Sequence, residues 1–307
     1  MRRFQQTRHA LGSTAYLTIV LEDNDSPAEI FGVLWRQINA FEKQFSRFLV
    51  DSELSKFNAA AGNQQPISSA FRALLMTAKN NAESSGGLYN PCILPALQRA
   101  GYKGSWPQPH KAADKLVYEK RVVAKWQDIQ IGDIWAMIPA NTALDFGGIG
   151  KGYLLDKLAE TLHTRQVINY WLSLGGDILC SGHDVTGDSW RIRIQNARTE
   201  NTFVASVKND EDRLATATSG ITKRQGISET GPWHHIIDPR TGAPARTDIL
   251  TATVCTNNAT IADVAAKCLI IAGSDSAESV LSMLRVTSAL LQKSDGTTIK
   301  LGTIWLA

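Results

Sequence analysis

The sequence predicts an α+β fold, and three observations support this. Short runs of β-branched or alternating residues, which favour strands, lie between amphipathic runs that have the period of a helix. The two kinds of segment do not alternate strictly, as a doubly wound parallel fold would require. No repeat, low-complexity stretch or linker divides the chain, so we expect one domain over residues 1–307.

Composition excludes several classes of protein. An apolar content of 43% with 20% charged residues is typical of a globular protein with a sizeable core. The net charge of +3, with no basic cluster among aromatic residues, argues against nucleic-acid binding. No apolar run approaches the ~18 residues that suggest a membrane-spanning helix.

The cysteines and the N-terminus bear on the compartment. The four cysteines lie far apart and form no CxxC pair, which indicates buried thiols more than a disulfide or zinc framework. The basic N-terminus lacks the continuous apolar core and cleavage site of a signal peptide. We therefore expect a cytoplasmic protein as the sequence is written. The alternative is a periplasmic protein whose export signal is absent from this chain.

The first half of the chain is expected to contain three helices and several strands. Ser26-Pro27-Ala28-Glu29 has the form of a capping box with proline at the first helical position. Prolines make LYNPCILPAL, residues 88–97, a rigid loop. The other expected elements are a strand at 14–21, a short helix at Ser52, a helix over 69–82 that stops at Gly86-Gly87, and short strands at 116–125 and 129–138.

The second half mixes the two kinds of element in the same way. WRIRI at 190–194 alternates apolar and charged residues, as a half-exposed strand does. A helix is expected over 260–271, capped by Thr260 and stopped by Gly273. The other expected elements are a helix after Tyr153, strands at 167–174, 203–207, 214–218 and 249–255, an Asp-Pro turn within 234–244, a helix at 277–284, and strands near Ser288 and Thr303.

The stretch that points most clearly to chemistry is LDFGGIGKGY, residues 144–153. An amphipathic run follows it, so it predicts a loop that opens a helix. Glycines let the backbone approach a ligand closely, N–H groups at a helix start attract phosphate, and Lys151 adds a positive charge. The spacing matches neither GxxxxGK[ST] nor GxGxxG. On this stretch alone, phosphate binding and tight packing remain equal alternatives.

A few histidine and aspartate side chains are candidates for a site. Only His234 and His235 lie beside other candidate groups, and a functional or a structural role for His235 is equally open because strand neighbours point to opposite faces. Asp177 and Asp238 sit in turns that they can stabilise. Asp263 falls in the first turn of an expected helix. It either stabilises the helix dipole or ligates a metal ion that binds a diphosphate.

Seven segments occur in a specific order. SRFLVDSELSKFN and SSGGLYNPCILPAL are followed by LDFGGIGKGYLLD, SLGGDIL, ATSG, HHIIDPRTGAP and ATIADVAAKCLIIAG. Together they resemble the FAD:protein FMN transferase (ApbE) family over residues 10–273. The resemblance implies an α+β domain of the T-fold type that binds FAD between its layers. It also implies magnesium-dependent transfer of FMN from FAD to a threonine hydroxyl of an acceptor flavoprotein, with release of AMP.

The resemblance further implies roles for individual residues. Asp145 and Lys151 are expected to contact FAD, and the carbonyl of Gly148 and the carboxylate of Asp263 to bind Mg²⁺. His235 is expected close to FAD, so Asp263 and His235 are the expected catalytic residues. Asp177 resembles a structural aspartate of the family that makes no direct contact. Other positions in the FAD-binding segments are Leu11, Phe48, Asn90, Pro91 and Cys92, and Lys267 stands at a metal-ligand position.

Several of these positions depart from the family pattern. Leu11 replaces a methionine, Phe48 an aromatic residue that is usually Tyr or Trp, Asn90 a carboxylate and Cys92 a threonine. ITKRQG replaces a tyrosine-rich segment after ATSG. Flavin binding survives such changes more easily than catalysis does. Two alternatives to FMN transfer therefore stay open: hydrolysis of FAD to FMN and AMP, and flavin binding without catalysis.

Lys267 is the most serious departure, because it replaces a threonine that ligates the metal. Asp263 and Lys267 are four apart on an expected helix, the spacing at which side chains meet. A unit charge ~4 Å from a divalent ion at an effective dielectric constant near ~20 costs about 8 kcal/mol, twice the figure for two unit charges. Either Lys267 points elsewhere and magnesium binds weakly, or the ammonium replaces the metal. We expect weakened magnesium binding, since the FAD diphosphate itself helps to recruit the cation.

Overall fold

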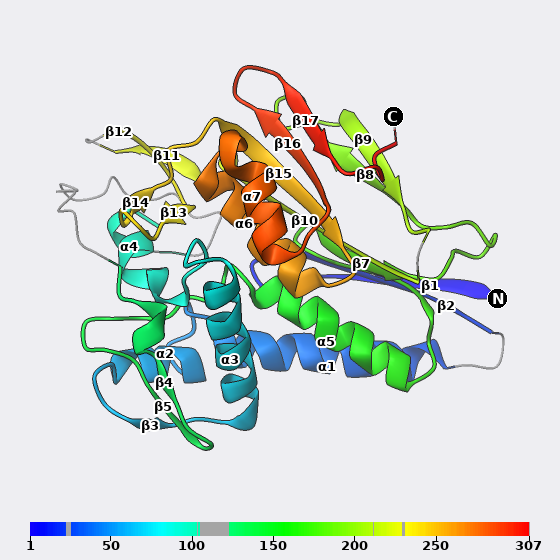
Figure 1. The fold of residues 1–307 in the computed structure, drawn as a ribbon. Coiled ribbons are helices and arrows are strands. Elements are labelled where there is room, and N and C mark those ends of the chain that lie inside the picture. The colour runs from blue at the N-terminus through cyan, green and yellow to red at the C-terminus, as the bar shows by residue number, and fades with distance from the viewer. Residues whose placement is uncertain (23–25, 103, 105–122, 211, 229–230, 307) are drawn as a thin grey trace.

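An eight-stranded antiparallel sheet organises the fold (Figure 1). The computed structural model describes residues 1–22, 26–102, 104, 123–210, 212–228 and 231–306. In spatial order the strands are β1 (Arg2–Ala10), β2 (Ser13–Leu21), β6 (Asn169–Leu174), β7 (Asp177–Ser181), β10 (Arg213–Gly220), β15 (Ile249–Thr256), β16 (Ser288–Lys293) and β17 (Thr298–Leu301). The fold is α+β, as predicted. The single domain over residues 1–307 stays a prediction.

Helices cover one face of this sheet. They are α1 (Pro27–Phe45), α5 (Gly150–Thr164) and α6 (Ala259–Ala272), with α7 (Ala277–Leu284) packed against α6 (Figure 1). On α1, Leu34 and Ile38 recur at helical spacing and are fully buried. Nearly all of α6 is buried, because it lies between the sheet and the other helices. A charged side chain on α6 therefore needs a partner inside the protein.

A hairpin covers the opposite face of the sheet. It consists of β8 (Arg191–Gln195) and β9 (Phe203–Lys208). Ile192 and Ile194 are buried while Arg191 and Arg193 are exposed, so the alternation predicted for WRIRI is confirmed. The inward residues form a second apolar cluster with sheet residues of the face away from α6: Val20, Cys180, Cys255 and Leu290. The central strands of the sheet thus have buried residues on both faces.

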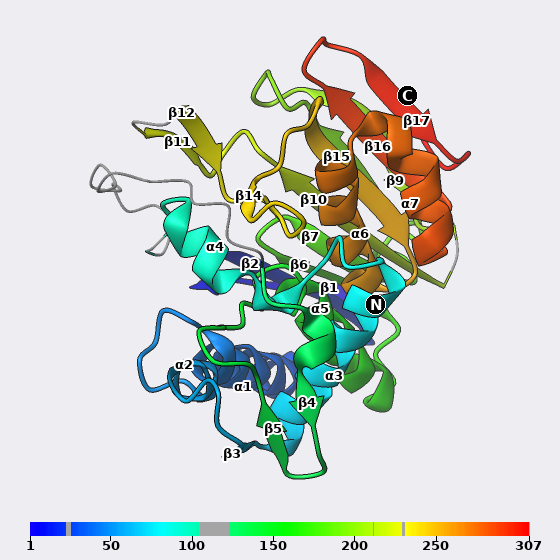
Figure 2. The same cartoon turned by 60° about the vertical axis from the view of Figure 1, so that its left-hand side comes forward.

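The remaining elements flank the helices and one end of the sheet (Figure 2). Ser52 and Ser68 accept hydrogen bonds from Ser55 N and Phe71 N and so cap α2 and α3. The helical elements here are α2 (Glu53–Ala59), α3 (Ser69–Ser84), η1 (Pro91–Ile93), α4 (Leu94–Arg99), η2 (Trp126–Asp128) and η3 (Ser274–Ser276). The strands are β3 (Gln65–Pro66), β4 (Gln130–Ile131), β5 (Trp135–Met137), β11 (Gln225–Ser228), β12 (Gly231–His234), β13 (Ile237–Asp238) and β14 (Ala243–Pro244).

Some predictions about these elements were wrong. LYNPCILPAL is helical in η1 and α4, because both prolines occupy first-turn positions, where a missing N–H costs nothing. Ser26 makes no side-chain cap bond, and Glu29 pairs with Arg165 at 3.0 Å instead. Asn258, not Thr260, caps α6. The last strand lies at 298–301 and not near residue 303. Most of the strand predicted at 116–125 falls outside the described residues.

Other expectations are confirmed. All four cysteines are free and buried. Within the described part of the chain, no helix combines the length and the apolar character that crossing a membrane requires. The predicted helix at 277–284 and the strands at 14–21, 203–207 and 249–255 are found within one residue or two of the expected ends.

Candidate functional site

A cavity of about 1100 Å³ lies where the start of α5, the middle of α6 and the segment after β10 meet. Ligand pockets typically span about 300–1000 Å³, so this one suits a large ligand. Its lining also includes the turn after β1, residues 45–49, residues 88–90 and the loop after β8. Segments from nearly the whole chain therefore contribute to one site.

The glycine-rich loop is fixed by Asp145. The buried carboxylate accepts a hydrogen bond from Gly147 N at 2.7 Å and an ion pair from Arg47 Nε at 2.8 Å. Its own N–H donates to the carbonyl of Pro91 at 2.8 Å. Asp145 and Gly148 both line the cavity, and their predicted contacts with FAD and with Mg²⁺ stay predictions. In this arrangement Asp145 holds the loop and the Arg47 guanidinium in place.

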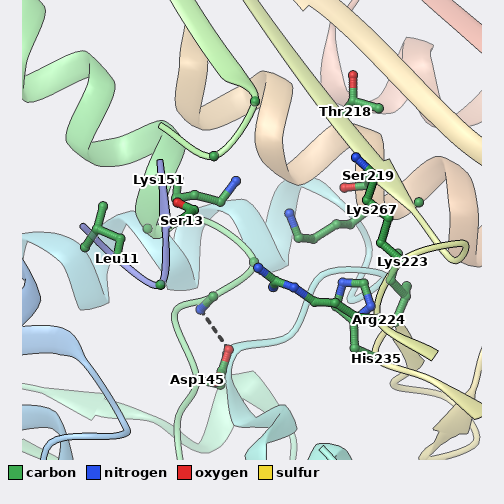
Figure 3. A pocket seen from close by; sticks show the side chains of 18 of the residues that line it. Leu11, Ser13, Asp145, Lys151, Thr218, Ser219, Lys223, Arg224, His235 and Lys267 are labelled. Atoms are coloured by element: carbon green, nitrogen blue, oxygen red, sulfur yellow. Dashed lines mark hydrogen bonds between the residues drawn. The ribbon is translucent and has the colours of Figure 1, made fainter. Parts of the chain in front are cut away.

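Lys151 lies in the first turn of α5 and points into the cavity (Figure 3). Its ammonium pairs with Asp177, whose other oxygen accepts a hydrogen bond from Thr218 N at 3.3 Å. Asp177 is buried and does not line the cavity, and its predicted place outside direct ligand contact stays a prediction. Burial, with smaller contributions from the charges of Lys267 and Arg224, lowers the pKa of Lys151 to about 8, although the charge of Asp263 acts in the opposite direction.

Asp263 and Lys267 form an ion pair on α6. The carboxylate is 1% exposed, and its other oxygen accepts a hydrogen bond from Gly152 N at 3.2 Å. The ammonium faces the cavity, so the expectation that Lys267 points elsewhere is wrong. The reason is local: a buried carboxylate one turn away needs a counter-charge. Asp263 itself lies behind the lysine, outside the lining.

Gly152 lets α5 and α6 approach closely. A Cβ added there would lie 2.3 Å from the carbonyl oxygen of Ala259 and 2.9 Å from Cβ of Asp263. Real Cβ atoms do not approach backbone this closely, so only glycine fits. In the GKG part of the motif, Gly152 thus allows the two helices to pack closely, and Lys151 places a positive charge in the cavity. Tight packing is therefore confirmed at Gly152, and phosphate binding at Lys151 stays a prediction.

The two adjacent histidines point to different surroundings, as strand geometry predicted. His234 Nε2 lies 3.0 Å from the carbonyl oxygen of Ala245. His235 lines the cavity, and its Nδ1 is buried with no hydrogen-bond partner in the described part of the chain. Burial, together with the smaller effects of the charges of Arg224 and Lys267, lowers the pKa of His235 to about 3. The imidazole is therefore neutral at physiological pH.

The aromatic side of the cavity is built around Arg47. Its guanidinium lies 4.3 Å from the ring centroid of Phe48 and 4.8 Å from that of Tyr102. Phe48 lines the cavity and is 44% exposed, so a flat ligand can reach its ring. Leu11 also lines the cavity, with a left-handed φ of 56°, and its N–H donates to Glu42 Oε1 at 3.0 Å.

Of the three predicted residues in YNPC, only Asn90 lines the cavity. Its Oδ1 accepts a hydrogen bond from Cys92 N at 2.9 Å, and its Nδ2 donates to Ala124 O at 3.0 Å. This cap starts η1 and turns Pro91 and Cys92 into the core. Burial raises the pKa of Cys92 to about 12, so the thiol stays protonated. Pro91 and Cys92 are buried beneath the loop and lie outside the lining of the cavity.

Sequence reasoning missed several cavity residues. Arg224 and Lys223 belong to ITKRQG, which the sequence marked only as a departure from the family. Two adjacent basic residues straight after ATSG were the available signal. The Arg224 guanidinium points toward the same space as Lys151 and Lys267 (Figure 3). The other missed residues that line the cavity are Arg47, Tyr102, Arg193, Arg198, Thr218 and Ser219.

Comparisons with known proteins place the chain in a family. Residues 11–291 match the family described as the ApbE family. A Treponema pallidum protein named FAD:protein FMN transferase is 29% identical over 80% of this chain and 70% of its own length. A Vibrio cholerae protein of the same name is 24% identical over 85% of this chain and 78% of its own length.

Solved structures show the same fold. The ApbE protein of Thermotoga maritima matches with a TM-score of 0.86 over 98% of this chain and 97% of that chain, at 22% sequence identity. The flavin transferase ApbE from Vibrio cholerae gives a TM-score of 0.82 over the same shares, also at 22% identity. Because the match of residues 11–291 covers most of its length, the chain belongs to the ApbE family.

Proposed function

We propose that this chain binds FAD in the cavity and transfers FMN from it to an acceptor protein. Its relatives from Treponema pallidum and Vibrio cholerae carry the name FAD:protein FMN transferase. The observation that carries the proposal is the convergence of Lys151, Lys267 and Arg224 on one cavity of about 1100 Å³. Three cations at one point suit the diphosphate of a dinucleotide, and the cavity is large enough for its other groups.

Transfer of FMN requires stabilisation of negative charge on the phosphate oxygens more than it requires covalent catalysis. A threonine hydroxyl oxygen of the acceptor forms a bond to the phosphorus on the FMN side, and the bond from that phosphorus to the bridging oxygen breaks. AMP leaves with the electron pair of the broken bond, and the hydroxyl proton passes to water or to the departing AMP phosphate. Negative charge builds up on the phosphate oxygens, and cations fixed in a partly buried site stabilise it without reorganising.

His235 is placed beside these cations, and its imidazole is neutral. Its pKa of about 3 in the ligand-free protein makes it a weak proton acceptor. A bound diphosphate would offset the charges of Arg224 and Lys267 that lower this pKa. We assign His235 a hydrogen-bonding role next to the diphosphate, with proton transfer favoured only when FAD is bound.

The family resemblance also predicted a magnesium ion. The residues as they are arranged do not fit one. The Lys267 ammonium forms an ion pair with one carboxylate oxygen of Asp263, and Gly152 N–H donates a hydrogen bond to the other. Among the described residues, no group of three or more His, Cys, Asp and Glu side chains could hold a metal ion. The carbonyl of Gly148 is no substitute for a second carboxylate. No step of the proposed transfer is therefore assigned to a metal.

One experiment separates the proposed function from its alternatives. The purified chain is incubated with FAD and magnesium, with and without an acceptor flavoprotein stripped of its flavin. Transfer releases AMP only with the acceptor and leaves covalent flavin fluorescence on the acceptor in a denaturing gel. AMP without the acceptor would show hydrolysis, and FAD retained without AMP would show binding alone. The Vibrio cholerae relative, run in parallel, checks that the acceptor is competent.

A further inference from the structure

We infer that this site binds the FAD diphosphate through three protein cations, Lys151, Lys267 and Arg224, and needs no divalent metal ion. The inference rests on the proposed function for the identity of the ligand. Its basis is the place of the Lys267 ammonium, which occupies the Asp263 carboxylate that a metal would have to use. The consequence is a flavin site whose affinity for FAD is independent of magnesium.

The three cations come from three separate elements. Lys151 lies in the first turn of α5, Lys267 in the middle of α6, and Arg224 in the segment between β10 and β11. Their nitrogen ends point toward one another in the cavity (Figure 3), close enough for Lys267 and Arg224 to influence the charge state of Lys151. Like charges repel when brought together, so the ligand-free site carries a cost that an anion removes.

The aspartates occupy only some of the N–H donors of Lys151 and Lys267. Asp177 accepts one contact from the Lys151 ammonium, and Asp263 accepts two from the Lys267 ammonium, through its carboxylate and its backbone carbonyl, whereas an ammonium has three N–H donors. The aspartates thus orient the two lysines and leave donors directed at the cavity. Arg224 has no ion pair with any described carboxylate, so no carboxylate balances the charge of its guanidinium. Two tethered ammonium groups and one guanidinium match the oxygens of a diphosphate.

The Asp263 carboxylate is closed to a metal from both sides. It is 1% exposed, with Lys267 on Oδ1 and Gly152 N–H on Oδ2. A divalent ion would have to displace the ammonium, which is held by its own helix and also lies 3.3 Å from the Asp263 carbonyl oxygen. Displacement would leave two positive charges side by side in a confined space. Lys267 and the backbone around Asp263 supply no further carboxylate oxygen, the ligand that magnesium prefers.

The first test compares FAD binding by the wild-type chain in EDTA and in magnesium, by flavin fluorescence and calorimetry. We expect dissociation constants that agree within about twofold. Affinity weaker by about tenfold or more in EDTA would overturn the inference, since about tenfold corresponds to one lost charge-assisted contact. FAD binding in neither buffer would instead contradict the proposed function, so the two failures are distinguishable.

The second test restores a metal-compatible residue with Lys267→Thr. In EDTA the variant should bind FAD at least about tenfold more weakly, and magnesium should restore its affinity and raise its Tm, because the metal neutralises Asp263. Lys157→Thr, an exposed lysine of α5 outside the cavity, is the control for the loss of one charge and should show neither effect. A Lys267→Thr variant that binds FAD as tightly in EDTA as the wild type would overturn the inference.

A third measurement does not depend on how well the variant folds. Mn²⁺ replaces Mg²⁺ at oxygen sites and is visible by electron paramagnetic resonance. The wild-type FAD complex should lower the signal of aqueous Mn²⁺ no more than FAD alone does. One tightly bound Mn²⁺ per wild-type FAD complex would show that a metal enters despite Lys267 and would contradict the inference.

Discussion

Lys151 and Lys267 face the cavity, each held by a buried aspartate, and the two pairs differ in how the chain builds them. Lys151 and Asp177 come from α5 and β7, 26 residues apart, while Lys267 and Asp263 are one turn apart on α6. Each aspartate also accepts a hydrogen bond from a backbone N–H of another element, Thr218 for Asp177 and Gly152 for Asp263. The same chemical unit thus arises once from tertiary structure and once from helix periodicity.

The comparison shows which pair depends on its surroundings. The Lys151–Asp177 pair holds α5 to the sheet, so it forms only when both are in place. The Lys267–Asp263 pair needs only its own helix, but its carboxylate is 1% exposed and so depends on the lysine for its charge balance. Substitutions on the two sides should therefore have different consequences.

The largest expected effect comes from Gly152→Ala, which separates α5 from α6. The added Cβ would meet the carbonyl oxygen of Ala259 at 2.3 Å, and backbone cannot move aside as a flexible side chain does. We expect a loss of more than about 3 kcal/mol in the free energy of unfolding, measured by urea denaturation. Gly32→Ala is the control: it is also in a helix, and its nearest neighbour is the end of the Arg36 side chain at 3.5 Å. A loss in Gly152→Ala no larger than in this control would contradict the close packing.

Asp263→Asn removes the charge that balances Lys267. Breaking a buried pair costs about 3–5 kcal/mol, and we expect the lower end because the Lys267 side chain is 19% exposed and can turn to water. Turnover should be lost as well, since the lysine leaves its position. Asp177→Asn is the matched variant and should weaken the attachment of α5 to the sheet. Unchanged unfolding midpoints in both variants would show that neither pair contributes to stability.

Lys151→Ala tests the tertiary pair as a ligand contact. Losing one charge-assisted hydrogen bond to a phosphate should weaken FAD binding by about 1.5–3 kcal/mol. Riboflavin, which has no phosphate, should bind the variant and the wild type alike. Titrations that gave the same FAD affinity for both proteins would reduce the glycine-rich turn to a packing element.

The smallest effect concerns the pH response of His235. Its pKa of about 3 lies below the ordinary value of about 6.5, so the unfolded chain binds more protons between these values. His235 therefore lowers the stability of the fold as the pH falls below about 6.5 and has no effect above it. By NMR, the ring of His235 should not titrate between about pH 5 and 8 without ligand, and FAD should raise its pKa. A midpoint near about 6.5 without ligand would show that the ring is hydrated.

Local patterns predicted the elements that local chemistry determines. The strand β2, the helix α3 and its stop at two glycines, and the last helix follow from β-branched runs, caps and helical periodicity. The i,i+4 contact of Asp263 with Lys267 followed from spacing alone. By contrast, β1 was missed because RRFQQTRHA is a polar edge strand with almost no buried side chains, so no apolar alternation marks it.

The rest of the site depends on contacts between distant segments. Arg47 reaches Asp145, and Arg224 reaches the two lysines, through the packing of elements that no spacing in the sequence relates. The direction of Lys267 was also mispredicted. The prediction rested on the repulsion between the Lys267 ammonium and a metal ion. The need of the buried Asp263 carboxylate for a counter-charge is the stronger effect.

The order of strands in the sheet has a consequence for folding. Ala15 pairs with Leu174, while the residues between them build α1 to α5, so the sheet closes only after most of the chain is present. Such non-local pairing gives a high contact order and slow folding. The cavity is lined by segments on both sides of this closure, so a ligand bound in it stabilises the whole fold. At a ligand concentration about 100 times the dissociation constant, this adds about 2.7 kcal/mol to the free energy of unfolding.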